Sequence, residues 1–449
     1  MKRKLFLRGI CLLLIFLTLS SAFIPAASAS SFEAGLPDVS GASNVYFSNL
    51  DSGRVLLGKN QNKKIAPAST VKIMTGLLAL EHFEGRIDTT VEVTSQMLSE
   101  SDGTSMKLTA GELMTVRDLV LGVICGGYND AAHVLAHAVA GNTQDFVAMM
   151  NAKAIELGAL STNYKNPTGW DTEGAYTTAS DVALIAKAAM KNPIYMELSS
   201  VVSEKVKPQN SDREITVHNR NSLIASYYAE GYTNRYAEGM IAGMTDAGGY
   251  CVVSRFVIKG ATYLCVVMGA TEQSGTINSF AIANELSAYA RTSLGFVKIA
   301  SSGDTICEVP VDFALFESSE KNEDHTVNVC IGADVSTLLP IDVNVESEIT
   351  VKHYLYSEHL RAPLSTGERV GGVDFYYGGE IVASAPLVVC EDVQENEIVV
   401  SIERLKSTLL GRASAISAVI FVILFSLWFY FFDYKKRRRK TRKISYRNY

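Results

Sequence analysis

The order of the predicted secondary structure restricts the fold of this chain most. Two predicted strand hairpins, over residues 44–57 and 250–268, enclose a region in which apolar residues recur at helical spacing. Helices are predicted there over 71–81, 115–124, 129–139, 143–157 and 179–191, and a closing helix over 277–292. Asn129-Asp130 is expected to cap the third of these helices and Asn192-Pro193 to end the fifth, and Lys259-Gly260-Ala261 is the predicted turn of the second hairpin. Helices grouped between strands are typical of a mixed α+β domain with a mainly antiparallel sheet, rather than of a doubly wound parallel sheet.

From about Val297 onward the sequence consists of short β-rich runs that turns separate, without helical periodicity. These runs cover residues 305–313, 325–331, 342–356, 371–377 and 380–389. We therefore predict a mixed α+β domain over 32–292, a separate small all-β domain over 297–392 and a linker over 393–412.

Both ends of the chain have the composition of membrane-directed segments. Four basic residues precede an apolar run that ends before Ala29, which predicts a secretory signal peptide over 1–29. A retained anchor is the alternative, although the apolar run is short for one. At the other end, Ala413 to Phe432 carry no charge and are long enough to cross a bilayer, and a basic tail over 433–449 follows. Because positive charge stays in the cytoplasm, we expect one C-terminal transmembrane helix, a cytoplasmic tail and an extracytoplasmic body.

The charge of the predicted extracytoplasmic part argues against nucleic acid and anionic lipid as ligands. Without the four basic residues of the leader, and the nine basic and one acidic residues after Phe432, it keeps 28 Lys plus Arg against 46 Asp plus Glu. The resulting charge near −18 favours an extracytoplasmic enzyme or binding module.

Cysteine and histidine give no sign of a metal site or a cofactor. Six of the seven cysteines lie beyond the leader, and their even number permits disulfides, but their irregular spacing assigns no pair. No two cysteines have the short spacing of metal ligands, and the seven histidines are scattered. We therefore expect neither a metal nor a cofactor.

Ser69 and Lys72 are the strongest candidates for catalysis. Small residues and a proline lead into Ser69, and the apolar periodicity that follows places the serine near a helix N-terminus. Residues three apart share a helix face, so the Lys72 amine can take the proton of the Ser69 hydroxyl. A capping serine beside an exposed lysine is the alternative interpretation. The same spacing recurs at Ser318 and Lys321, but in a polar run without a helix behind it.

Ordered segments along the chain resemble the serine D-alanyl-D-alanine carboxypeptidases, also called low-molecular-weight penicillin-binding proteins. The resemblance covers nearly the whole predicted extracytoplasmic chain. It includes 66–72, Asn129-Asp130-Ala131-Ala132, 166–169, 218–223, the hairpin after Gly239, and, in the β-rich end, 336–340, 361–364 and 385–388. It implies a penicillin-binding, serine β-lactamase-like fold.

Three short motifs carry the chemistry of such enzymes, namely Ser-x-x-Lys, Ser-x-Asn and Lys-Thr-Gly. The first is intact as Ser69 and Lys72. The second aligns with 127–129, so Asn129 is kept and Gly127 replaces the serine that is thought to relay a proton. The third aligns with 241–243, where only Gly243 is kept.

At the third motif, Ile241 and Ala242 replace the lysine and threonine that receive the substrate carboxylate. Arg235, Arg255 or Lys259 are candidates to replace the missing cation, with no positional argument for any of them. The pKa of Lys72 has no predicted direction, because loss of a neighbouring cation raises it and an apolar neighbour lowers it.

The resemblance implies a membrane-anchored carboxypeptidase that acts on the D-Ala-D-Ala end of peptidoglycan stem peptides and that β-lactams can acylate. Ser69 is then the nucleophile, Lys72 the base and Asn129 an orienting residue, while the backbone amides of Ser69 and Met244 form the oxyanion hole. Gly127, Ile241, Ala242 and Gly243 line the substrate site. The altered motifs leave a second hypothesis, a pseudoenzyme that binds or organises peptidoglycan without turnover. A β-lactamase is a weaker third hypothesis.

Overall fold

The computed structural model describes residues 36–315 and 326–444, which form two compact units. The first unit contains the described residues up to Val297 together with 337–348 and 378–380, and the second contains the remainder. The predicted leader over 1–29 lies outside the described residues, as do Ser318 and Lys321.

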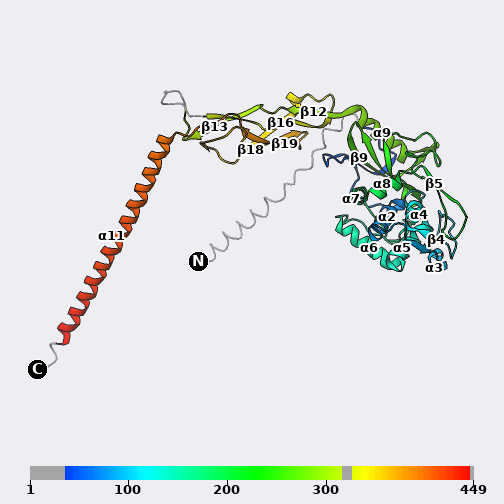
Figure 1. Ribbon diagram of the computed structural model, residues 1–449, viewed down its shortest axis with the longest axis horizontal. Coiled ribbons are helices and arrows are strands. Elements are labelled where there is room, and N and C mark those ends of the chain that lie inside the picture. Colours follow the sequence, from blue (N-terminus) through cyan, green and yellow to red (C-terminus); the bar gives the residue numbers. More distant parts are fainter. Residues whose placement is uncertain (1–35, 316–325, 445–449) are drawn as a thin grey trace, which may run out of the picture. The chain divides into compact units, whose positions relative to one another are not determined.

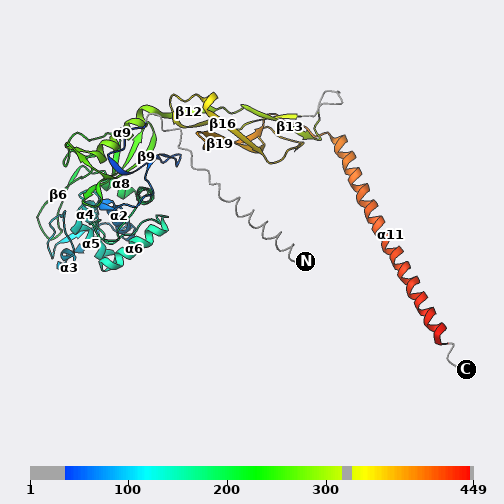
Figure 2. The same ribbon diagram turned by 180° about the vertical axis from the view of Figure 1, so that it is seen from behind.

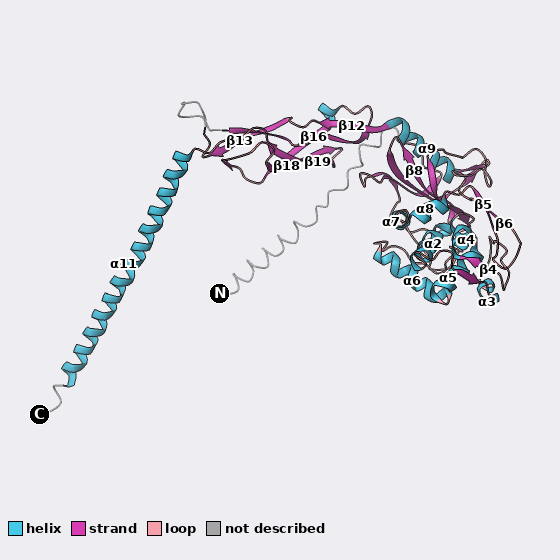
Figure 3. Ribbon diagram, in the orientation of Figure 1, coloured by secondary structure: helices cyan, strands magenta, loops and turns pink. Residues whose placement is uncertain are grey.

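The first unit is built around a five-stranded antiparallel sheet of order β2-β1-β9-β8-β7, which confirms the predicted mixed fold (Figure 3). Its strands are β1 (Ala42–Asn49), β2 (Val55–Lys59), β7 (Ala237–Thr245), β8 (Gly249–Ile258) and β9 (Ala261–Ala270). The two predicted hairpins are β1-β2 and β8-β9, and β7 forms one edge. Shorter pairs are β3 (Thr90–Glu92) with β4 (Leu113–Thr115), β5 (Ser203–Val206) with β6 (Ile215–His218), and β10 (Glu272–Gln273) with β11 (Thr276–Ile277).

Helices pack against this sheet and against one another. They are η2 (Ala68–Thr70, a 3-10 turn), α2 (Val71–His82), α3 (Ser95–Ser99), α4 (Val116–Ile124), α5 (Asn129–Ala140), α6 (Thr143–Glu156), α7 (Ala179–Ala189), α8 (Pro193–Ser199) and α9 (Asn278–Ser293). Helix α9 contacts β8 and β9 (Figure 3). The 3-10 turn η2 and helix α8 contact β7. Helices α2, α4, α5 and α6 form one cluster in both views (Figures 1 and 2). The core thus places η2 and the start of α2 beside the edge strand.

Two predicted helix boundaries differ from the structure. Asn129, expected to cap α5, is the first residue of that helix, and its N-cap is Tyr128, whose side chain makes no capping bond. Asn192 and Pro193, expected only to end a helix, begin α8, because the Asn192 side chain accepts hydrogen bonds from the N–H groups of Ile194 and Tyr195.

The second unit contains a six-stranded sheet of order β16-β18-β19-β14-β13-β17. The strands are β13 (Thr305–Asp312), β14 (Thr326–Ile331), β16 (Ile349–Leu355), β17 (Leu360–Arg361), β18 (Arg369–Tyr377) and β19 (Glu380–Val389). Outside this sheet, β12 (Leu294–Ala300) and β15 (Val335–Pro340) form a separate pair. The run predicted over 342–356 begins as a short helix, α10 (Val345–Glu348), which belongs to the first unit. Cys330 and Cys390, for which the sequence assigned no partners, form a disulfide, because β14 and β19 pair beside them.

The last helix, α11 (Glu397–Ile444), includes most of the predicted linker and the whole predicted span. Residues 397–436 are long and apolar enough to cross a membrane, with a mean hydropathy of 2.4 in the most apolar window. The apolar side chains between Ile416 and Phe432 are exposed in the structure, as the lipid-facing side chains of a span would be. The structure therefore supports one C-terminal candidate for a membrane-spanning helix.

Candidate active site

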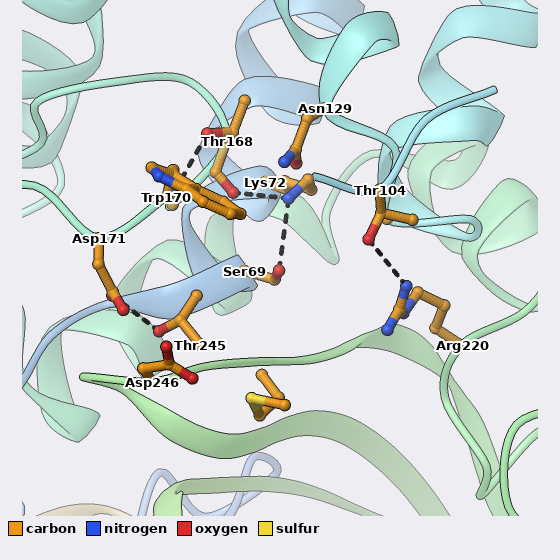
Figure 4. A pocket seen from close by; sticks show the side chains of 13 residues that line it. Ser69, Lys72, Thr104, Asn129, Thr168, Trp170, Asp171, Arg220, Thr245 and Asp246 are labelled. Atoms are coloured by element: carbon orange, nitrogen blue, oxygen red, sulfur yellow. Dashed lines mark hydrogen bonds between the residues drawn. The ribbon is translucent and has the colours of Figure 1, made fainter. Parts of the chain in front are cut away.

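The Ser69 hydroxyl lies next to the Lys72 amine. Ser69 occupies the middle of the 3-10 turn that leads into α2, and its Oγ accepts a hydrogen bond from Lys72 Nζ at 3.3 Å (Figure 4). Lys72 also donates to the carbonyl of Thr168 at 2.6 Å. The structure therefore brings together the predicted nucleophile and base, with Lys72 buried instead of exposed.

Two unusual backbone positions form the turn at Ser69. Ala68 has a φ of +47°, a conformation that residues with a side chain rarely adopt. Gly169, with φ +80°, lies so close to the Ala68 carbonyl that a β-carbon at position 169 would overlap it. Glycine thus allows the 166–169 loop to lie against the nucleophile and to deliver the Thr168 carbonyl to Lys72.

Burial determines the charge state of Lys72. Only 1 % of its surface is exposed, and desolvation, followed by repulsion from the Arg220 charge, lowers its pKa from 10.5 to about 7. The question that the sequence left open is thus decided by burial. At neutral pH a large fraction of the amine is unprotonated, and an unprotonated amine can accept the proton of Ser69.

Asn129 binds the loop that contains Asp102 and Thr104, and Thr104 lines the cleft. Its side-chain amide donates to the carbonyl of Asp102 at 2.5 Å, and its backbone N–H donates to the carbonyl of Thr104. The carboxylate of Asp130 accepts hydrogen bonds from Ser105 and from two backbone amides of the same loop. The start of α5 thus fixes the position of Thr104 at the cleft.

Arg220 is a cation in this cleft that no motif in the sequence singles out. Its Nη1 donates to Thr104 Oγ1 at 3.2 Å (Figure 4). Its guanidinium lies 4.7 Å from the centre of the Tyr228 ring. The only sequence signal for it is its position within the 218–223 segment that resembles the carboxypeptidase family. The three cations proposed instead do not line the cleft: Arg255 pairs with Glu238, and Arg235 binds the Tyr236 hydroxyl.

Strand β7 forms the other wall of the cleft. A β-carbon at Gly243 would lie 2.5 Å from Ser69 Cβ, so this glycine allows the strand to pass directly beside the nucleophile. The next residue, Met244, lines the cleft on a strand whose outer edge pairs with no other strand in the described sheet. Asp171 holds the end of β7 by accepting hydrogen bonds from the Thr245 hydroxyl and the Ala247 N–H.

Ile241 and Ala242 do not line this cleft, although they align with the carboxylate-binding motif. Ile241 is 2 % exposed and packs in the core. Ala242 is also buried, and it borders a second cavity next to the first. The two replacements are accommodated because both positions are packed within the unit rather than open to the cleft.

The resulting cleft has a volume of about 420 Å³. It is lined by Ser69, Lys72, Thr104, Gly127, Asn129, Thr168, Gly169, Trp170, Asp171, Arg220, Met244, Thr245 and Asp246. Among the described residues no cluster of histidine, cysteine and carboxylate side chains could hold a metal ion. The cleft can therefore combine a nucleophilic serine, a neutral amine and a guanidinium, which is a suitable set for acyl transfer from a substrate with a carboxylate.

Comparison with known proteins identifies the family of this chain. Residues 31–272 match the D-alanyl-D-alanine carboxypeptidase family, and residues 294–395 match the C-terminal domain of penicillin-binding protein 5. The chain is 28% identical over 359 residues to D-alanyl-D-alanine carboxypeptidase DacF of Bacillus subtilis, with 79% of this chain and 86% of that protein covered. It is 29% identical over 397 residues to DacC of Escherichia coli, with 87% and 92% covered.

Among solved structures, penicillin-binding protein 5 from Haemophilus influenzae superposes with a TM-score of 0.58 at 26% identity. That match covers 80% of this chain and 99% of the other. A Streptomyces K15 DD-transpeptidase variant matches 56% of this chain, with a TM-score of 0.51. This chain therefore belongs to the D-alanyl-D-alanine carboxypeptidases of the low-molecular-weight penicillin-binding protein family.

Proposed function

We propose that this protein is a membrane-anchored serine carboxypeptidase that removes the terminal D-alanine from peptidoglycan stem peptides through an acyl-enzyme on Ser69. The observation that carries the proposal is the buried Lys72 amine, 3.3 Å from Ser69 Oγ and with a pKa of about 7. A neutral amine at that distance can activate a serine for attack on an amide carbonyl.

In the first half of the reaction, Lys72 takes the proton of Ser69 as Oγ bonds to the penultimate D-alanine carbonyl carbon. The backbone amides of Ser69 and Met244 stabilise the oxyanion. The C–N bond then breaks, and the Lys72 ammonium returns the proton to the leaving amine of the terminal D-alanine. In the second half, Lys72 takes a proton from water as the water oxygen bonds to the ester carbonyl carbon. The bond from that carbon to Ser69 Oγ then breaks, and the Lys72 ammonium returns the proton to Oγ.

Arg220 binds the terminal carboxylate in this proposal. It is the only lysine or arginine besides Lys72 among the described residues that line the cleft, and its guanidinium offers paired donors that match a carboxylate. It therefore replaces the lysine that is missing at position 241. β-Lactams carry a carboxylate at the corresponding place, so we expect the site to be acylated by them.

The substitution at Gly127 favours a second candidate function. No hydroxyl at this position can pass a proton between Lys72 and the leaving amine, and without that step the fold would serve as a peptidoglycan-binding pseudoenzyme. The first candidate requires Lys72 itself, or a water molecule, to complete the proton transfer.

Labelling with a fluorescent penicillin and release of D-alanine from a stem pentapeptide separate the two candidates. The wild type should do both, Ser69→Ala should do neither, and Ser52→Ala, which alters an exposed turn serine, should match the wild type. A wild type that is silent in both assays, but binds wall fragments as well as Ser69→Ala does, would establish the pseudoenzyme.

The proposed location is the outer face of the cytoplasmic membrane, with residues 1–29 removed as a leader and 413–432 spanning the bilayer. The basic residues after Phe432 support a cytoplasmic C-terminus, because positive charge stays on the cytoplasmic side. Reporter fusions after Tyr449 test this topology: a fluorescent protein should be active there, and a secreted phosphatase should be inactive.

A further inference from the structure

A second cavity, of about 230 Å³, adjoins the catalytic cleft beside strand β7. We call it the β7 cavity. Arg220 and Met244 line both spaces, so the two meet at the proposed carboxylate-binding residue. The β7 cavity continues past Ala242, whose side chain is a single methyl group, to the start of α9 at Ser279 and Phe280.

The lining of the β7 cavity suits an uncharged group. Apolar or weakly polar side chains, among them Ala242, Cys251 and Phe280, form much of its wall. Among the described residues that line it, Arg220 is the only one with a charged side chain. The burial of a second charge there would require a partner that these residues do not provide.

Two serine hydroxyls at the wall lack partners. Ser222 and Ser279 both border the β7 cavity and are at most 1 % exposed, and neither hydroxyl makes a hydrogen bond with the described residues. Buried hydroxyls are normally paired, because an unpaired one has lost its bonds to water without replacement. A ligand group that enters the cavity could supply the missing partner after a small adjustment of the wall.

The substrate's geometry points to the group that would enter. When Arg220 holds the terminal carboxylate, the α-carbon of the leaving residue is one bond away from that carboxylate. The side chain of the leaving residue therefore lies near Arg220, where the β7 cavity opens. The methyl group of D-alanine would leave most of a 230 Å³ space unfilled.

We propose that the β7 cavity is a subsite for the side chain of the leaving D-amino acid, and that it accepts uncharged side chains larger than methyl. This inference rests on the proposed carboxypeptidase function. The substrate class is a stem peptide with a terminal residue such as D-methionine or D-glutamine. D-Glutamine has an amide that can bond to the serine hydroxyls, whereas D-lysine would place a second cation beside Arg220.

The test measures kcat/KM of the full-length protein in detergent on stem peptides that end in D-alanine, D-methionine, D-glutamine or D-lysine. The D-methionine and D-glutamine peptides should react within about threefold of the D-alanine peptide or faster, and the D-lysine peptide at least about tenfold more slowly. Ser279→Leu fills the cavity, so it should lower kcat/KM for the D-methionine and D-glutamine peptides at least about tenfold more than kcat/KM for the D-alanine peptide. Thr292→Leu adds the same side chain to an exposed position of α9 and should change nothing.

Penicillin labelling of Ser279→Leu reports whether that variant is folded. If it is not, Phe280→Ala enlarges the same space and should raise release of D-phenylalanine relative to D-alanine at least about threefold. Release of D-alanine alone by the wild type, or ratios that neither variant changes, would overturn the subsite and leave the carboxypeptidase function standing. If the wild type releases no D-amino acid, the carboxypeptidase function itself is refuted, and the subsite with it.

Discussion

The side chain of Arg220 lies against the backbone of Gly127, so that a β-carbon at position 127 would stand 2.8 Å from Arg220 Cδ. Gly127 also has a φ of +69°, which favours glycine. The missing hydroxyl of the second motif and the cation in the cleft are thus coupled: the observed position of Arg220 requires a residue without a side chain at 127.

We therefore expect any side chain at position 127 to displace Arg220 and to impair catalysis. Gly127→Ala should slow penicillin acylation at least about tenfold and reduce the free energy of unfolding by about 1–3 kcal/mol through backbone strain. Acylation rates and thermal unfolding measure the two effects. Gly141→Ala is a matched control, because Gly141 has a φ of +82° and no atom near its missing β-carbon, so it should lose stability without loss of acylation.

The same contact predicts that restoration of the family motifs fails. Gly127→Ser meets Arg220, and Ile241→Lys places an ammonium group in the core, where a buried charge without a partner is strongly destabilising. The combined change Gly127→Ser, Ile241→Lys and Ala242→Thr should therefore yield a less stable protein with slower acylation. Faster acylation than the wild type would show that Arg220 does not replace the motif lysine.

Replacement of Arg220 tests its role as the carboxylate-binding residue. A charge-assisted hydrogen bond contributes about 1.5–3 kcal/mol, so Arg220→Ala should lower kcat/KM for the stem peptide about 10- to 100-fold. Arg220→Lys should recover part of the loss, because it keeps the charge without the paired donors. Arg235→Ala removes an exposed cation outside the cleft and should stay within about twofold of the wild type. If Arg220→Ala and Arg235→Ala lowered kcat/KM equally, Arg220 would not be the carboxylate-binding residue.

The fold was predictable from the sequence to the extent that local patterns encode it. The spacing of apolar residues and the turn at Lys259 and Gly260 predicted the β8-β9 hairpin, and the order of elements predicted an antiparallel sheet. The start of α8 was missed because an Asn-Pro pair can end one helix or begin the next. The partner of Cys330 could not be assigned because it depends on the pairing of β14 with β19.

The Ser69–Lys72 pair was predictable because a single turn of helix connects the two side chains. The position of Arg220 in the cleft was not, because it depends on the approach of a distant loop to Gly127. The direction in which the pKa of Lys72 shifts also depends on its burial, which the spacing of apolar residues alone does not define. Local helix geometry was thus sufficient to predict that Ser69 and Lys72 lie together, whereas the position of Arg220 depends on tertiary packing.

The pKa of Lys72 predicts how activity depends on pH. Since catalysis requires the unprotonated amine, kcat/KM should rise about tenfold per pH unit below about pH 7 and level off above it. Arg220 is the second cause of the lowered pKa after desolvation, so Arg220→Gln should move the midpoint to higher pH as well as lower the rate. A profile that is flat from about pH 5.5 to 8.5 would exclude Lys72 as the base.

Burial of Lys72 should also destabilise the protein, in a pH-dependent way. Its pKa of about 7 in the folded protein lies below the ordinary lysine value of 10.5, so between these pH values the unfolded state binds a proton that the folded state does not. Above about pH 10.5 this lysine therefore does not lower the free energy of unfolding, and the free energy falls as the pH decreases from 10.5 towards 7. At about 1.4 kcal/mol per pH unit, the loss at pH 7 is about 5 kcal/mol.

Lys72→Met should therefore abolish acylation and yet stabilise the first unit. The variant leaves the Thr168 carbonyl without its donor, which costs about 1–3 kcal/mol. The free energy of unfolding should therefore increase by about 2–4 kcal/mol at pH 7. The gain should shrink as the pH rises towards 10, because the wild type then recovers its own stability. Thermal unfolding at pH 7 and pH 9.5 measures the difference.

Lys153→Met is the control with the opposite sign, since Lys153 pairs with Glu81 and Glu156 and its removal should slightly destabilise the protein. A Lys72→Met variant less stable than the wild type at pH 7 would mean that the amine is charged and well paired in the folded protein, and that another group activates Ser69.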